Sequence, residues 1–321
     1  MSALIATSLP LAKTSMDPGA SLNDTKTEME ASYAVLKFME SFCLLSSACG
    51  MVGNGIVIWF LGFHIKRNPF TVYILNLAVS DFGYLLCIAI ETVQYLMQFN
   101  VGVQFGIFLF LDLFMYGTGL YLLTTISIER CLSVLCPVWF RCHRPKHLSS
   151  IMSALLWALS FLVCGLGYIS CSVSTLHNCQ QILITIGVLD FLICTPLMVL
   201  SGLTLVFRVC CSSHRFKTGR LFTVILLTIL FFLIFAVPLG ALLLLDFWNY
   251  KFLYSPEIGF VLSCVNSSLN PAIYFLVGSY RDRQFRDTLR VALQKVFEEE
   301  VNFRGERETA SAELEMTTTT Q

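Results

Sequence analysis

Residues 41–90 read SFCLLSSACGMVGNGIVIWFLGFHIKRNPFTVYILNLAVSDFGYLLCIAI, which is two apolar runs on either side of a short basic turn. The runs, Ser41–Phe63 and Phe70–Ile90, both reach the length of about 20 residues that a helix needs to cross a bilayer. Asn68 and Pro69 close the turn between them. This stretch therefore predicts two transmembrane helices joined by a short loop.

Five more apolar runs of spanning length follow the first two. They cover Phe105–Leu123 (continuing to Leu135), Leu148–Cys171, Ile182–Phe207, Leu221–Leu245 and Ile258–Val277. Pro196, Pro238 and Pro271 fall inside the last three runs, where a bilayer tolerates proline because neighbouring helices and water satisfy the freed carbonyls. The sequence therefore predicts an all-α membrane protein, a bundle of seven transmembrane helices.

The composition agrees with burial in a bilayer. Hydrophobic residues make up 56% of the 321 residues and charged residues 13%, with a mean hydropathy of +0.72. A soluble domain carries about 25% charged residues. The net charge is zero, so no global field attracts nucleic acid. We therefore expect a membrane protein with no nucleic-acid partner.

The distribution of Lys and Arg predicts the orientation. The loops after the first, third and fifth spans and the C-terminal segment hold most of the 21 basic residues. The opposite side holds only Lys13, Lys26, Lys37 and Lys251. Because cytoplasmic loops are enriched in Lys and Arg, we expect a multi-pass protein of the plasma membrane with its N-terminus outside and its C-terminus in the cytoplasm.

Four regions follow from this topology. Residues 1–37 are polar and poor in aromatic residues, which predicts a disordered extracellular segment, and Asn23 begins a glycosylation pattern there. Residues 38–278 form the predicted bundle. Residues 279–297 have apolar positions at helical spacing with Arg and Lys between them, which predicts an amphipathic helix on the inner leaflet. Residues 298–321 are a polar cytoplasmic tail.

Polar residues inside the predicted spans are candidates for function. Asn54, Asp81 and the pair Asn270-Pro271 lie well inside spans, and Tyr274 follows one turn later. Asn266 also lies in the last span and should face the bundle interior. Such residues either serve signalling or form hydrogen bonds that only hold helices together.

An acidic and a basic residue meet at the cytoplasmic end of the third span. Glu129 and Arg130 are adjacent in the sequence and can form a local ion pair. Breaking that pair would release Arg130 to bind something new. The alternative is an ordinary pair of charges on a solvated helix end.

These motifs, in this order, resemble those of the rhodopsin-like G-protein-coupled receptors: GN in span one, LAVSD in span two, ERC after span three, Trp157 in span four and NPxxY in span seven. Residues 126–160, ISIERCLSVLCPVWFRCHRPKHLSSIMSALLWALS, look like the Mas-related receptors. The resemblance implies a receptor that passes binding of an extracellular ligand to a heterotrimeric G protein. It also implies membrane lipid and arrestin, bound through the tail, as further partners.

The resemblance also implies roles for single residues. Arg130 docks the G protein and is held by Glu129 in the inactive state. Pro137 marks the intracellular loop that contacts the G protein, and Tyr274 moves inward on activation. Asp81 and Asn270 belong to a polar cluster that holds sodium in relatives; in this chain a small polar residue of that cluster is replaced by Gly119.

The chain departs from the usual pattern at the outer end. The cysteine that starts span three in most rhodopsin-like receptors is absent, because Phe105 lies there. Some Mas-related receptors link spans four and five instead, and Cys171 and Cys179 fit that bridge; two free thiols are the alternative. The usual tryptophan before the span-six proline is replaced by Ala236.

Asp112 is the leading candidate for ligand binding. It lies 18 residues before Arg130. At 3.6 residues per turn this is five turns, so the two side chains share one helix face about 27 Å apart. A buried carboxylate near the outer mouth would bind a cationic small molecule or a basic peptide; pairing with a neighbouring helix, or solvation, is the alternative. Glu91 and Asp190 are further acidic candidates.

Two other classes of function find less support in the sequence. No H-E-x-x-H, G-x-S-x-G or glycine-rich phosphate loop is present, so we expect no enzyme and no cofactor. No paired C-x-x-C motifs indicate a metal site. A seven-span transporter is the remaining alternative, but inverted repeats, which mark many transporters, are not evident.

Overall fold

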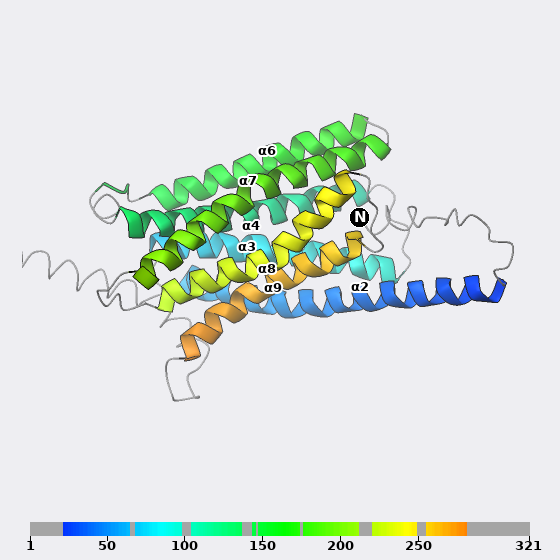
Figure 1. Cartoon of the computed structure of the whole chain (residues 1–321), viewed down its shortest axis with the longest axis horizontal. Helices are drawn as coiled ribbons and strands as arrows, with labels where there is room; N and C mark the ends of the chain where they lie inside the picture. The colour runs from blue at the N-terminus through cyan, green and yellow to red at the C-terminus, as the bar shows by residue number, and fades with distance from the viewer. Residues whose placement is uncertain are drawn as a thin grey trace, which may run out of the picture.

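The computed structural model describes residues 22–64, 68–97, 104–136, 143–145, 147–173, 176–211, 220–248 and 255–280. Within these ranges the chain forms seven α-helices, arranged as one elongated bundle (Figure 1). They are α2 (Leu22–Trp59), α3 (Pro69–Leu96), α4 (Gln104–Leu135), α6 (Leu148–Val173), α7 (Leu176–Cys211), α8 (Arg220–Phe247) and α9 (Ser255–Tyr280), and α2 runs directly into a short π-helix, η1 (Phe60–His64).

Six of the seven helices contain one predicted span each, and α2 together with η1 covers the first span, so the all-α bundle is confirmed. Five of the helices are long and apolar enough to cross a membrane when only the described residues are counted. The polar residues Asn266, Ser267, Ser268 and Asn270 lower the hydropathy of α9, as its sequence suggested. The predicted amphipathic helix at 279–297 lies almost entirely outside the described residues.

The N-terminal boundary differs from the prediction. The sequence suggested a disordered segment up to residue 37, but α2 begins at Leu22. Its first turns are rich in Glu, Lys, Met and Ala, which favour helix once a long helix is already nucleated further along the chain. In Figure 1 this blue end of α2 extends past the other helices.

The start of α3 shows how a local sequence fixes a helix end. The side chain of Asn68 accepts hydrogen bonds from the backbone N–H of Phe70 (2.9 Å) and of Thr71 (2.8 Å). The hydroxyl of Thr71 in turn accepts one from the N–H of Asn68, which completes a capping box. Pro69 occupies the first helical position, where its missing N–H costs nothing.

The predicted prolines also lie inside helices, at Pro196 in α7, Pro238 in α8 and Pro271 in α9.

The bundle exposes many large apolar side chains on its outside. On α6 these include Ile151, Leu155, Leu159, Phe161, Leu162, Leu166 and Ile169. Such a wide apolar surface does not suit water, so it indicates contact with lipid.

The interior has two apolar clusters. The larger one joins Val57, Tyr73, Leu77, Leu122 and Met198 from four helices. The smaller one contains Cys43, Tyr84, Leu85, Ile88 and Cys264. The polar residues discussed below lie between and around these clusters. We call the two ends of the bundle the Arg130 end and the Asp112 end.

Candidate functional site

The Arg130 end contains a buried polar network around Glu129. One nitrogen of the Arg144 guanidinium donates to both carboxylate oxygens of Glu129, at 2.8 and 3.1 Å. The same nitrogen donates to the hydroxyl of Ser149 at 2.6 Å. The hydroxyl of Tyr73 donates to the Glu129 carboxylate at 2.7 Å. The segment before α6 is thereby tied to α3 and α4.

Arg130 itself lies against an aromatic ring. Its guanidinium carbon is 4.1 Å from the ring centre of Phe70, at the start of α3. The resemblance implied that Glu129 holds Arg130. Among the residues that the structure describes, the ion pair of Glu129 is with Arg144. The adjacent pair of charges therefore makes contacts on different neighbours.

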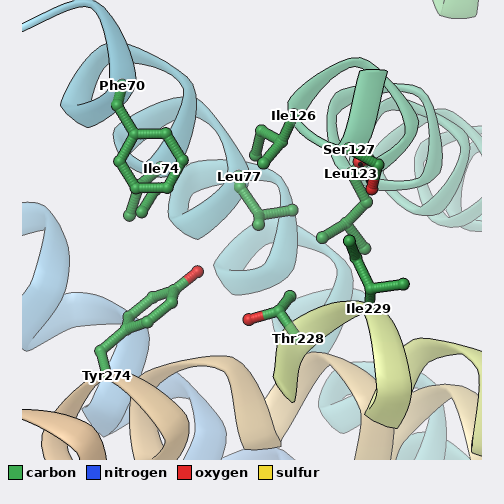
Figure 2. Close-up of a pocket in the computed structure, with 9 residues that line it drawn as sticks. All are labelled: Phe70, Ile74, Leu77, Leu123, Ile126, Ser127, Thr228, Ile229 and Tyr274. Atoms are coloured by element: carbon green, nitrogen blue, oxygen red, sulfur yellow. Dashed lines mark hydrogen bonds between the residues drawn. The ribbon is translucent and has the colours of Figure 1, made fainter. Parts of the chain in front are cut away.

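Phe70 also lines a small cavity between α3, α4, α8 and α9, shown in Figure 2. The cavity has a volume of about 10 Å³, the lower limit for one water molecule. The hydroxyl of Tyr274 points toward this space from α9, and that of Thr228 faces it from α8. Tyr274 therefore lines the same cavity as the Phe70 ring that Arg130 contacts.

The predicted polar core is brought together in the middle of the bundle. The side-chain amide of Asn270 donates to the Asp81 carboxylate at 2.7 Å. The amide of Asn54 donates to the carbonyls of Gly50 (3.0 Å) and Ser267 (3.1 Å). Asn266 is buried nearby in α9. These bonds tie α2, α3 and α9 together at the level where Pro271 lies within α9.

The Asp112 end is acidic. Asp112 on α4 is only 4% exposed, and one of its carboxylate oxygens has no hydrogen-bond partner within the described residues. Glu91 on α3 lies within electrostatic range of it. Glu257 in the first turn of α9 is 8% exposed and also has an oxygen without a partner there. Glu40 on α2 accepts a hydrogen bond from Thr92 at 3.1 Å.

These carboxylates are not arranged as a metal site. In the part of the chain that the structure describes, no three His, Cys, Asp or Glu side chains are close enough to hold one metal ion. The acidic side chains come from four different helices, α2, α3, α4 and α9.

Asp190 does not join this group. It lies on α7 and accepts a hydrogen bond from the hydroxyl of Tyr121 at 2.7 Å. Tyr121 follows Asp112 by nine residues in α4, which is about two and a half helical turns and therefore the opposite face of the helix. The structure thus separates Asp190 from Asp112 and gives it a partner on a neighbouring helix.

A disulfide joins Cys171, near the end of α6, to Cys179, in the first turns of α7. It lies at the Asp112 end and links the helices that the sequence suggested. Pro137 lies outside the described residues. Asn23 lies in the first turn of α2.

The comparison with known protein families establishes which class of membrane protein this chain belongs to. A model of the 7 transmembrane receptor (rhodopsin family) matches residues 53–274. The chain belongs to the rhodopsin family of seven-transmembrane receptors. It is therefore a multi-pass membrane protein of a signalling family, as the ordered motifs indicated.

Several receptors are similar to this rhodopsin-family chain along most of their length. The proto-oncogene Mas of Mus musculus is 44% identical over 266 residues, 79% of this chain and 82% of that protein. The Mas-related G-protein coupled receptor member H of Mus musculus is 41% identical over 308 residues, 93% and 95% of the two chains. Member D of Macaca fascicularis is 41% identical over 287 residues, 85% and 89%. The predicted resemblance to Mas-related receptors is confirmed.

Sequence reasoning missed several members of the receptor's polar clusters. Arg144 was only one of the basic loop residues, and Tyr73 was one aromatic residue in an apolar run. Neither has a local signal, because each finds Glu129 across helices. Glu257 did have a local signal in the sequence, since an acidic residue directly after Pro256 at the end of a span is unusual.

Proposed function

We propose that this rhodopsin-family receptor lies in the plasma membrane, binds a cationic small molecule or a basic peptide outside the cell at the Asp112 end, and activates a heterotrimeric G protein inside the cell at the Arg130 end. The basic residues support this orientation, because they gather in the loops at the Arg130 end and in the C-terminal segment.

The single observation that supports a cationic ligand is the burial and incomplete hydrogen bonding of the Asp112 carboxylate. Its carboxylate is buried, and one oxygen has no hydrogen-bond partner among the described residues. A buried carboxylate oxygen without a partner is costly, and an ammonium or guanidinium group offers both a charge and hydrogen bonds. Glu91, close enough to act electrostatically, adds to the attraction for a positive ligand.

The G-protein half of the proposal rests on the arrangement at the other end. Arg130 and Asp112 lie on one unbroken helix, α4, so a change at one end can reach the other through a single rigid element. Arg130 contacts Phe70, which shares a cavity with Tyr274 of the proline-containing α9. A movement of α9 would therefore shift Tyr274 relative to the Phe70 ring that Arg130 contacts.

The remaining segments follow the same topology. We propose that residues 1–37 face the outside and carry a glycan on Asn23, although the helix already begins at Leu22. Residues 279–297 would lie on the inner leaflet and contact lipid. Residues 298–321 would form the cytoplasmic tail to which arrestin binds.

Replacing Asp112 with asparagine is expected to raise the concentration of a cationic agonist needed for half-maximal response by at least about 30-fold, since losing one partner of a buried charge pair costs about 2 kcal/mol or more. The measurement is a dose–response curve with an agonist selected from a library of amines and Lys- or Arg-rich peptides. Asp190→Asn is the matched control, because it removes an α7 carboxylate that is hydrogen-bonded to Tyr121, on the face of α4 opposite Asp112. An unchanged response of Asp112→Asn at equal surface expression would contradict the proposed ligand site.

Receptor-stimulated nucleotide exchange tests the G-protein half. Receptor purified into lipid nanodiscs is expected to accelerate nucleotide release from at least one member of a panel of heterotrimers. Vesicles that contain the receptor should take up no more of the labelled agonist than empty vesicles do. Uptake without any acceleration of exchange would support a transporter and overturn the proposal.

A further inference from the structure

Glu257 is a second buried carboxylate with an oxygen that lacks a hydrogen-bond partner, on a different helix from Asp112. It lies in the first turn of α9, and its side chain is 8% exposed. One of its oxygens has no partner within the described residues, as is also true of Asp112 on α4. Buried polar groups are normally hydrogen-bonded, so each of these oxygens indicates a missing donor.

Both carboxylates lie above the smaller apolar cluster of the interior. Glu257 precedes Cys264 by seven residues, which is about two helical turns, so the two side chains share one face of α9. Cys264 belongs to that cluster and is fully buried. Asp112 precedes Tyr116 by four residues on α4, and Tyr116 packs against the same cluster. The two acidic side chains therefore face the same part of the bundle interior from two helices.

One tyrosine places the two carboxylates at a similar depth. The ring centre of Tyr84 on α3 is 5.4 Å from that of Tyr116 on α4, and the hydroxyls of Tyr84 and Ser263 on α9 are hydrogen-bonded at 2.5 Å. These three residues therefore lie at one level of the bundle. Asp112 lies four residues beyond Tyr116, and Glu257 six residues beyond Ser263, both toward the Asp112 end. At 1.5 Å per residue they are about 6 and 9 Å from this level, so their depths differ by about 3 Å.

Further carboxylates add negative charge around these two. Glu91 on α3 is within electrostatic range of Asp112. Glu40 on α2 and Glu257 are both within electrostatic range of Tyr95, which lies one turn beyond Glu91 on α3. A region lined by one sign of charge attracts the opposite charge, and a ligand with two charges gains more from it than a ligand with one.

We infer that Glu257 is a second cation-binding residue of the ligand site, and that the site takes a ligand with two positive groups. One group binds Asp112 and the other binds Glu257. Linear diamines and peptides that combine an N-terminal ammonium with a Lys or Arg side chain have this chemistry. The inference rests on the proposed function, since Asp112 must bind the first cationic group, and it narrows the ligand class from cations to dications.

The alternative role for Glu257 is stabilisation of the start of α9. An acidic residue in the first turn interacts favourably with the helix dipole. That role needs no burial, because such a residue acts equally well at the surface. The two roles also differ in what they affect, since a helix start acts on stability and not on the difference between a dication and a monocation.

The test compares linear diamines with amino alcohols of the same length, in which a hydroxyl replaces the second ammonium. Chain lengths of about 4 to 12 carbons bracket the spacing of about 8–10 Å between packed helices. Equilibrium dialysis measures binding to receptor in phosphatidylcholine nanodiscs, with empty nanodiscs as the blank. Wild-type receptor is expected to bind the best diamine at least about tenfold more tightly than its amino alcohol, which corresponds to about 1.4 kcal/mol.

Variants assign this difference to single residues. Glu257→Gln should weaken the diamine about tenfold and leave the amino alcohol unchanged, because the amide keeps the size of the side chain and loses only its charge. Asp112→Asn should weaken both compounds. Asp190→Asn is the matched control and should change neither, since its carboxylate already accepts a hydrogen bond from Tyr121 on another face of α4.

Two results would overturn the inference. One is equal affinity of diamine and amino alcohol at every length in wild-type receptor, a comparison that needs no variant and so decides even if Glu257→Gln does not fold. The other is a Glu257→Gln receptor that keeps the full preference for diamines, including one that binds both compounds more weakly by the same factor. Failure of the proposed function would look different, because then neither compound would bind, or Asp112→Asn would bind both as wild type does.

Discussion

Replacing Arg130 with alanine is expected to reduce receptor-stimulated nucleotide exchange by at least about 30-fold, because a central arginine at a protein interface commonly contributes more than 2 kcal/mol. A guanidinium offers five N–H donors in a planar fork, which alanine cannot replace. The measurement is single-turnover nucleotide exchange on a purified heterotrimer, with receptor in nanodiscs and agonist at saturation.

The fold should survive this change. The contact of Arg130 with Phe70 is a cation–π interaction, which is worth about 0.5–2 kcal/mol. Lys37→Ala is a suitable control, since it removes a cation that lies 4.8 Å from the ring centre of Tyr33 on α2, far from the Arg130 end. Lys37→Ala should leave exchange intact. Exchange by Arg130→Ala above half the wild-type rate would show that the switch lies elsewhere.

Replacing Gly50 with valine is expected to lower the apparent melting temperature of the receptor by about 10 °C or to prevent its surface expression, since overpacking costs about 1–3 kcal/mol or more and each kcal/mol is worth about 2–4 °C in a chain of this size. A Cβ at Gly50 would lie 2.9 Å from the Cα of Ser268, which is backbone of α9 and cannot turn away. Gly53, one turn later, faces Pro271 in the same way.

Gly55→Ala provides the matched control on the same helix. Its Cβ would meet only the ring of Phe82, at an ordinary 3.7 Å. Alanine also favours helix over glycine by about 1 kcal/mol, so the melting temperature should stay the same or rise. Thermal unfolding followed by a thiol-reactive dye or by size-exclusion chromatography measures both variants. If Gly50→Val melts like wild type, the close contact between α2 and α9 does not limit stability.

The polar core illustrates where sequence and structure agree. Asp81 and Asn270 are 189 residues apart, yet their motifs placed both in the middle of spans, and the structure joins them at 2.7 Å. The sequence could place both residues at a similar depth because depth in the bilayer follows from position in an apolar run. Two polar side chains at the same depth are both excluded from lipid, so they have few possible hydrogen-bond partners other than each other.

Asp190 illustrates what the sequence could not place. Its position in an apolar run made it a candidate for ligand binding, but the structure pairs it with Tyr121 on the face of α4 opposite Asp112. Depth alone does not give the direction of a side chain. That direction depends on how α7 is rotated against α4, and nothing in the local sequence of α7 specifies the rotation.

The sequence by itself determined the helices, their prolines and the shared face of Asp112 and Arg130, because these follow from apolar length and from 3.6 residues per turn within one segment. The ordered motifs also placed the chain among the rhodopsin-like receptors. Only the tertiary structure decided that Arg144 holds Glu129, that Arg130 lies on Phe70 and that four helices bring their carboxylates to one end. These contacts join residues of different helices, so they depend on how the helices pack and rotate against one another, which no single segment encodes.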